Sequence, residues 1–225
     1  DEHGLYLTGG GPEGCDYAVY VFLEDVCGMR FFHPGPLGTH VPVLPDLCLE
    51  SLSLRQVPSF VHRSICPDPQ VSDSRMFRDW QRWALRSRQG GPQLPLEPNL
   101  QRLVPSELYP THPDYFPFIA GSRVDPRSGT PWQPELSNPD VVQVAVERAR
   151  EHFAQHPQAW GFSLCNNGAG GWSESAEAVA DDPLEFRGFP DRGKARRVIV
   201  FANRVAEQVA QTHPGRYLVI SACQS

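Results

Sequence analysis

The sequence predicts an α/β protein with two parts: a small α/β lead-in domain in residues 1–57, and the first β/α units of a barrel or open parallel sheet in residues 58–225. After residue 58, short apolar runs alternate with amphipathic helical segments, which is the order of elements in parallel α/β folds. The earlier part contains one strand–helix–strand unit of about 30 residues. Because only three or four β/α units are present, we expect an incomplete barrel and further chain beyond Ser225.

The lead-in domain begins with a short apolar segment, residues 4–8, which we interpret as a strand that ends at a glycine-rich turn. In residues 17–24 apolar side chains recur every three or four positions, which predicts an amphipathic helix that stops at Gly28. A second strand is predicted at residues 29–32. Prolines interrupt the apolar pattern of residues 36–58, which indicates edge strands and a linker.

The second part starts with a strand candidate at residues 60–65. A helix over residues 73–88 follows, and either Ser72 or Asp73 is its predicted N-cap. The next segment, residues 90–134, is rich in proline and glycine and much longer than an ordinary connection. We therefore interpret it as a functional loop.

Regular structure returns at Asn138 and Pro139, because asparagine is a favourable N-cap and proline is favourable in the first helical turn. This pair predicts a helix over residues 139–155. The remaining predicted elements are a buried strand at 160–165, a helix at 194–212 and a buried strand at 217–223.

Composition and spacing exclude several classes of function. The net charge of −6, with acidic and basic residues interspersed, provides no basic surface for nucleic acid. No run approaches the roughly 18 apolar residues of a membrane span, and the first residues contain no signal segment. The six cysteines lack a CxxC pair, which argues against a metal site and favours free core thiols over disulfides. Because nucleotide and dinucleotide motifs are absent, we expect no cofactor.

The main candidate site is the glycine-rich segment after the strand at 160–165, where Asn166, Asn167 and Trp172 occur. In α/β barrels the active site lies at the carboxyl ends of the strands. Amides orient sugar hydroxyls or acetamido groups, and an indole face stacks on a sugar ring. The segment therefore predicts a carbohydrate subsite. The alternative is an Asn-Gly turn with a half-buried tryptophan.

Charged residues complete the candidate site. Glu174 and Glu177 either supply a carboxyl group for acid–base catalysis or are solvated charges at the start of a short helix. Arg63, at the end of the strand candidate 60–65, either faces the pocket or binds a backbone or carboxylate partner. Trp132 in the long loop either lines a sugar cleft or packs the loop onto the barrel.

Several blocks resemble bacterial glycosidases. The segments YAVYVFLE at residues 17–24 and GMRFFHPG at residues 28–35 resemble the lead-in of α-glucuronidase-like and hexosaminidase-like enzymes. The segments NLQRLVP at 99–105, HPDYF at 112–116 and SNPD at 137–140 are similar to a block of domain of unknown function family 4838. The resemblance covers nearly the whole chain, with its blocks in the same order.

Family 4838 overlaps glycoside hydrolase family 163, whose members include endo-β-N-acetylglucosaminidases that act on complex N-glycans. The resemblance therefore implies a TIM-like barrel behind a small α/β domain, with an oligosaccharide or glycan as the partner. It implies retaining hydrolysis in which the substrate's acetamido group is the nucleophile, and a protein acid is still needed. It adds Asn99 to the substrate-binding candidates, and it implies a secreted or periplasmic bacterial protein. The oligomeric state does not follow from it.

The chain departs from the family pattern in the loop after residues 160–165. That motif resembles "NDgggfCeCekC", with an aspartate that this chain replaces by an amide. Its three cysteines are replaced by Ser173, Ser175 and Ala178, whereas Glu174 is retained. An amide cannot act as a general acid or base, so either the acid lies beyond Ser225 or this branch differs.

We therefore expect a glycoside hydrolase-like protein acting on complex glycans, either endo-β-N-acetylglucosaminidase-like or α-glucuronidase-like, with Glu174 as the catalytic candidate. The alternative is a non-catalytic glycan-binding or scaffold protein that kept the barrel and lost the acid. A third alternative is an assembly protein with no sugar ligand.

Overall fold

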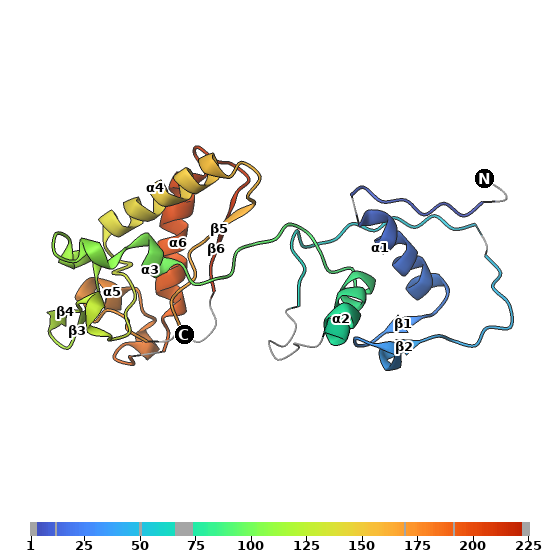
Figure 1. Cartoon of the computed structure of the whole chain (residues 1–225), viewed down its shortest axis with the longest axis horizontal. Coiled ribbons are helices and arrows are strands. Elements are labelled where there is room, and N and C mark those ends of the chain that lie inside the picture. The colour runs from blue at the N-terminus through green and yellow to red at the C-terminus, as the bar shows by residue number, and fades with distance from the viewer. Residues whose placement is uncertain are drawn as a thin grey trace. The chain divides into compact units, whose positions relative to one another are not determined.

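The structure is a computed structural model with a mixed α/β composition and three small two-stranded sheets among the described residues. Two compact units make up the chain, Asp1–Pro92 and Gln93–Ser225 (Figure 1). The described part of the chain contains no closed barrel. The residues that the structure describes are 4–11, 13–49, 51–65, 74–168, 170–190 and 192–221.

The first unit contains helix α1 (Gly14–Val21), which continues directly into the π-helical segment η1 (Phe22–Val26). The predicted helix in this region is therefore confirmed. It is followed by Gly28, whose φ of 73° lies in the left-handed region that glycine adopts without steric cost. The predicted glycine stop is confirmed as well.

A short antiparallel pair follows, formed by β1 (Arg30–Phe31) and β2 (Thr39–His40), with the 3-10 turn η2 (Pro36–Gly38) between them. Strand β1 confirms the prediction at residues 29–32, and β2 is the one strand within the described part of the proline-interrupted segment 36–58. The strand predicted at residues 4–8 is wrong, because this segment has no ladder partner among the described residues. An apolar run alone does not supply the second strand that a ladder needs.

Helix α2 (Ser74–Arg86) confirms the helix predicted over residues 73–88, but this helix belongs to the first compact unit and not to the second. It is attached to β1 through Trp83, whose indole Nε1 donates to the carbonyl oxygen of Phe31 over 2.9 Å. The predicted N-caps, Ser72 and Asp73, lie outside the described residues.

The strand predicted at residues 60–65 is wrong. Only Arg63 pairs, in an isolated antiparallel bridge with Gly90, and backbone N–H···O distances of 2.9 and 2.7 Å close that bridge. This bridge ties the segment to the turn after α2, so the first compact unit extends to Pro92. The domain boundary expected after residue 57 remains a prediction, and the compact units divide the chain at a different place.

In the second unit, α4 (Pro139–Gln155) and α6 (Ala195–Val209) lie side by side (Figure 1). The start of α4 is as predicted, because Asn138 Oδ1 accepts from the backbone N–H of Asp140 over 2.8 Å. Both helices present small and branched apolar side chains to the core. These buried residues include Val141, Ala145, Val146, Ala149, Val198, Phe201, Ala202 and Val205.

Parallel pairing joins β5 (Gly161–Ser163) to β6 (Tyr217–Val219), and an isolated parallel bridge joins Pro98 to Cys165 at the end of β5. Along the chain, α4 precedes β5 and α6 precedes β6, and the two strands pair in parallel. This alternation of helix and parallel strand is the order expected from the sequence for this part of the chain. The strand predicted at residues 217–223 corresponds to β6, which ends at Val219, and residues 222 and 223 lie outside the described residues.

The long segment before α4 is partly ordered into short turns and one hairpin. Its Trp132 is buried and lies 5.1 Å from the ring of Phe116, so it packs the segment onto the core. The short elements of the second unit are α3 (Leu100–Leu103), η3 (Ser106–Leu108), η4 (Pro113–Tyr115), β3 (Phe118–Ile119), β4 (Ser122–Arg123), η5 (Pro126–Ser128), α5 (Ala176–Ala180) and η6 (Leu184–Phe186).

Among the four cysteines that the structure describes, Cys165 is buried, as expected of a core thiol, and Cys27 is partly buried. Cys15 and Cys48 are exposed, and Cys66 and Cys223 lie outside the described residues. Among the helices that the structure describes, none has the length and apolar character needed to cross a membrane.

The cap of α4 is testable by replacing Asn138 with alanine. We expect Asn138→Ala to lower the free energy of unfolding by about 1 kcal/mol, because the N–H of Asp140 loses its acceptor. Urea unfolding followed by helical circular dichroism measures this loss. Asn138→Ser keeps an accepting oxygen and is expected to lose less; equal losses in the two variants would contradict the capping role.

Candidate functional site

Three amide side chains lie at the carboxyl edge of the parallel segments. The bridge between Pro98 and Cys165 places Asn99 beside Asn166, and Asn167 follows directly. The backbone N–H of Asn99 donates to the carbonyl of Cys165 over 3.0 Å, and its Nδ2 donates to a carbonyl of β5 over 2.9 Å. The structure therefore brings together these three of the residues predicted to bind substrate.

The loop after β5 is held by Gln133, whose side chain is fully buried. Its Nε2 lies 3.0, 3.5 and 3.3 Å from the carbonyl oxygens of Asn167, Gly168 and Gly170. Its Oε1 accepts from the backbone N–H of Asn167 over 3.0 Å. One amide group thus satisfies both backbone groups of Asn167. Sequence reasoning missed Gln133.

The side chains of the two loop asparagines differ in how they are satisfied. Asn166 Nδ2 donates to the carbonyl of Gly168 over 2.9 Å. Asn167 Nδ2 is buried and has no hydrogen-bond partner within the described part of the chain. Leaving such a donor unsatisfied costs about 1–3 kcal/mol, and an acceptor on a ligand would recover part of this cost.

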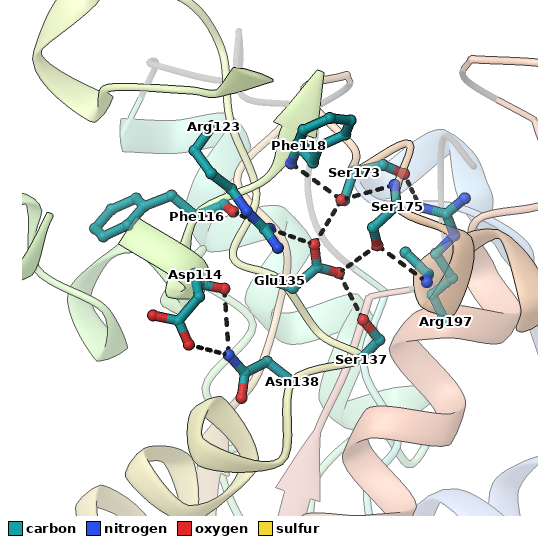
Figure 2. A network of polar contacts seen from close by, with 11 residues as sticks. Asp114, Phe116, Phe118, Arg123, Glu135, Ser137, Asn138, Ser173, Ser175 and Arg197 are labelled. Carbon is teal, nitrogen blue, oxygen red and sulfur yellow. Dashed lines mark hydrogen bonds and ion pairs between the residues drawn. The ribbon is translucent and has the colours of Figure 1, made fainter. Parts of the chain in front are cut away.

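Next to this loop, Glu135 is the centre of a buried polar network (Figure 2). Its Oε2 accepts from Arg123 Nη1 over 2.8 Å and from Ser173 Oγ over 2.6 Å. Its Oε1 accepts from Ser137 Oγ over 2.6 Å and from Ser175 Oγ over 3.3 Å. A buried carboxylate requires such partners. Ser173 and Ser175, at the positions of two motif cysteines, therefore bind a carboxylate in this chain.

The candidate acid Glu174 is exposed, but its carboxylate already has a partner. Its Oε2 accepts from the backbone N–H of Ala120 over 2.9 Å, and its own N–H donates to the carbonyl of Phe118 over 2.7 Å. Ala120 has a φ of 50° and Gly121 a φ of 84°, the signs that a tight hairpin turn requires. Glu174 thus stabilises the turn between β3 and β4. Glu177 is exposed in the first turn of α5, as in the solvated-charge alternative.

Two of the residues predicted to bind substrate have other contacts in the structure. Trp172 is 6% exposed and belongs to the core, which fits the alternative of a buried tryptophan more closely than a stacking platform. Arg63 belongs to the first compact unit, where its guanidinium donates to the carbonyls of Arg88 and Phe60 over 2.9 and 2.7 Å. These contacts correspond to the backbone-partner alternative for Arg63.

A buried ion cluster connects the loop to α6. Asp182 accepts from Lys194 and from Arg197, each over 2.6 Å, and the three side chains are at most 4% exposed. Arg197 Nη1 also donates to the carbonyl of Ser173 over 2.6 Å. Burial acts to raise the pKa of Asp182, but the hydrogen bonds from Arg197 and Lys194 outweigh burial and lower it.

The space around this network is too small for a sugar. A cavity of about 10 Å³ lies among Glu135, Trp172, Ser173 and Arg197, which is room for about one water molecule. Within the described ranges, no group of three or more histidine, cysteine, aspartate or glutamate side chains could hold a metal ion. The charged network therefore supports the loop and is not itself a binding pocket.

Comparison with known proteins identifies one family. The family model described as "Domain of unknown function (DUF4838)" matches residues 33–225, which is most of the chain. No curated protein and no solved structure matches the sequence.

The ion cluster predicts a large effect for Asp182→Asn. We expect a loss of about 3–5 kcal/mol in the free energy of unfolding at pH 7, because Lys194 and Arg197 remain buried without their counter-charge. Urea unfolding at neutral pH measures this loss. A loss below about 1 kcal/mol, the range of an exposed ion pair, would contradict the assignment.

The same carboxylate predicts a pH dependence. The pKa of Asp182 is lower in the folded chain than its usual value of 3.8, so its stabilising contribution is complete above about pH 5. That contribution is lost as the pH falls through the lowered folded pKa. Asp182→Asn is expected to remove this part of the acid dependence, and identical acid unfolding profiles of wild type and variant would argue against it.

Proposed function

The chain belongs to the DUF4838 family, and from this premise we propose that it is a glycoside hydrolase-like protein that binds complex glycans at the carboxyl edge of β5 and β6. The substrate classes in view are those of endo-β-N-acetylglucosaminidase-like and α-glucuronidase-like enzymes, which the sequence blocks resemble. A secreted or periplasmic bacterial location belongs to the same proposal, and cell fractionation would test it.

The observation that supports the proposal is the grouping of Asn99, Asn166 and Asn167 at one edge of the parallel segments. In β/α folds the carboxyl edge of the strands is where substrates bind. Amide groups offer both donors and acceptors, which match the hydroxyl and acetamido groups of sugars. Asn167 Nδ2, a buried donor without a partner in the described residues, is the group most suited to a ligand oxygen.

In the hydrolytic form of the proposal, Glu174 donates a proton to the leaving glycosidic oxygen. Its carboxyl group is exposed and lies on the same loop as Asn167. To act in this way it must release the N–H of Ala120 when the substrate binds. Substrate binding and the β3–β4 turn would then be coupled.

A non-catalytic glycan-binding protein is the second candidate function. One observation favours it: the carboxylate of Glu174 is already used to stabilise the turn at Ala120. An amide in place of the motif's aspartate, after β5, points in the same direction because it cannot transfer a proton. Both candidate functions place glycan binding at the carboxyl edge of β5 and β6, and they differ in whether the bound glycan is hydrolysed.

Binding is testable by calorimetric titration of the full chain with a biantennary complex N-glycan and with a glucuronic acid-substituted xylo-oligosaccharide. We expect one of the two to bind, and Asn167→Ala to weaken that binding about tenfold through loss of one hydrogen bond to the ligand. The matched control is Gln155→Ala, which removes an amide from the exposed face of α4. Absence of binding to both sugars would refute the proposal.

Turnover is testable with the same glycans carrying a fluorescent label. If the protein hydrolyses them, Glu174→Gln is expected to lower turnover about 10²- to 10⁴-fold, because the amide cannot donate the proton but can still accept from Ala120. Glu177→Gln is the matched control and should retain turnover. Binding by the wild type without released sugar would select the non-catalytic candidate.

A further inference from the structure

We propose that Gln133 is the positioning residue for Asn167 in the proposed glycan site, an inference that rests on the proposed function. Gln133 lies in the segment before α4, 34 residues from Asn167 in the sequence. Its side-chain amide holds the loop backbone at Asn167, and the Asn167 side chain has a buried Nδ2 without a hydrogen-bond partner among the described residues.

The geometry of the contact between Gln133 and Asn167 supports this role. Gln133 Oε1 accepts from the N–H of Asn167, and Gln133 Nε2 donates to the carbonyl of the same residue, each over 3.0 Å. A side-chain amide thus replaces the neighbouring strand that would otherwise pair with this backbone. Two hydrogen bonds to one residue fix its orientation as well as its position.

A further contact joins the two segments close to this pair of hydrogen bonds. The backbone N–H of Gln133 donates to the carbonyl of Gly171 over 2.9 Å. Gly171 has a φ of 73°, and a Cβ atom there would lie 2.4 Å from the carbonyl oxygen of Pro131. The loop backbone therefore lies directly against the segment that carries Gln133, and hydrogen bonds join the two at Asn167 and at Gly171.

The surroundings of Gln133 Nε2 also determine which residue type can occupy this position. Carbonyl oxygens of Asn167, Gly168 and Gly170 surround Nε2, so this position requires a donor with more than one hydrogen. Glutamate has the same shape but presents an anionic oxygen to these carbonyls at neutral pH. Burial and the surrounding oxygens would raise the pKa of such a glutamate, and its protonated form would donate one hydrogen bond.

The difference between glutamine and glutamate at this position is the basis of the experiment. The full chain and Gln133→Glu are titrated calorimetrically with the biantennary complex N-glycan at pH 7 and at pH 5, and amide hydrogen exchange is followed in residues 166–175. We expect the variant to bind about tenfold more weakly at pH 7, with faster exchange in the loop. At pH 5 it should regain part of the affinity, whereas the wild type should change much less. A role only in stability would lower the fraction of the chain that binds in the titration and would leave the affinity of the folded chain unchanged.

Gln101→Glu is the matched control, because Gln101 is exposed and makes one hydrogen bond, to the carbonyl of Trp132 over 3.2 Å. It should bind as the wild type does at both pH values. Wild-type affinity in Gln133→Glu at pH 7, or reduced affinity without recovery at pH 5, would overturn the proposal. If Gln133→Glu does not fold, Gln133→Met replaces it. We then expect weaker binding at both pH values, and unchanged binding would overturn the inference.

Failure of the proposed function is distinguishable from failure of this inference. If the wild type binds no glycan, the proposed function fails and loop exchange becomes the readout. Faster exchange in Gln133→Glu than in Gln101→Glu would then still support the positioning of Asn167 by Gln133. Equal exchange in the two variants would overturn it.

Discussion

Two buried polar side chains on one extended segment, Gln133 and Glu135, bind the loop after β5 along its length. Each would be costly to bury without partners, because a polar group removed from water must recover its hydrogen bonds inside the protein. The loop supplies those partners, through backbone carbonyls at Gln133 and through the hydroxyl groups of Ser173 and Ser175 at Glu135 (Figure 2). Loop and segment are therefore stable only in each other's presence.

The charges around Glu135 extend this constraint to the rest of the second unit. Arg123 on β4 donates both to Glu135 and to the carbonyl of Phe116, which joins the hairpin to the network. Arg197 on α6 donates to Asp182 and to the carbonyl of Ser173. Hairpin, loop and helix thus meet through charge-assisted hydrogen bonds, which are shorter and stronger than neutral ones. These hydrogen bonds and the apolar packing between α4 and α6 together stabilise the second unit.

This arrangement separates groups that support the site from groups that remain for a ligand. Glu135, Asp182 and Glu174 each accept hydrogen bonds from the protein itself. At the carboxyl edge, in contrast, Asn167 Nδ2 is buried without a partner in the part of the chain that the structure describes. The proposed glycan site therefore uses amide groups at this edge, while the three carboxylates have partners within the protein.

The sequence by itself determined α1, α2, α4 and α6 and the strands β5 and β6, because apolar periodicity and caps such as Asn138 act over a few residues. It failed at residues 60–65, since an apolar run does not specify the partner that a strand requires. Only the tertiary structure decided that Trp172 is buried, that Glu174 binds Ala120 and that Gln133 holds Asn167. The sole sequence signal for Gln133 and Glu135 was a pair of polar residues among Trp132, Pro134 and Leu136. Their partners in the loop after β5 lie 34 to 40 residues away, and hydrogen bonds between distant segments leave no periodic pattern.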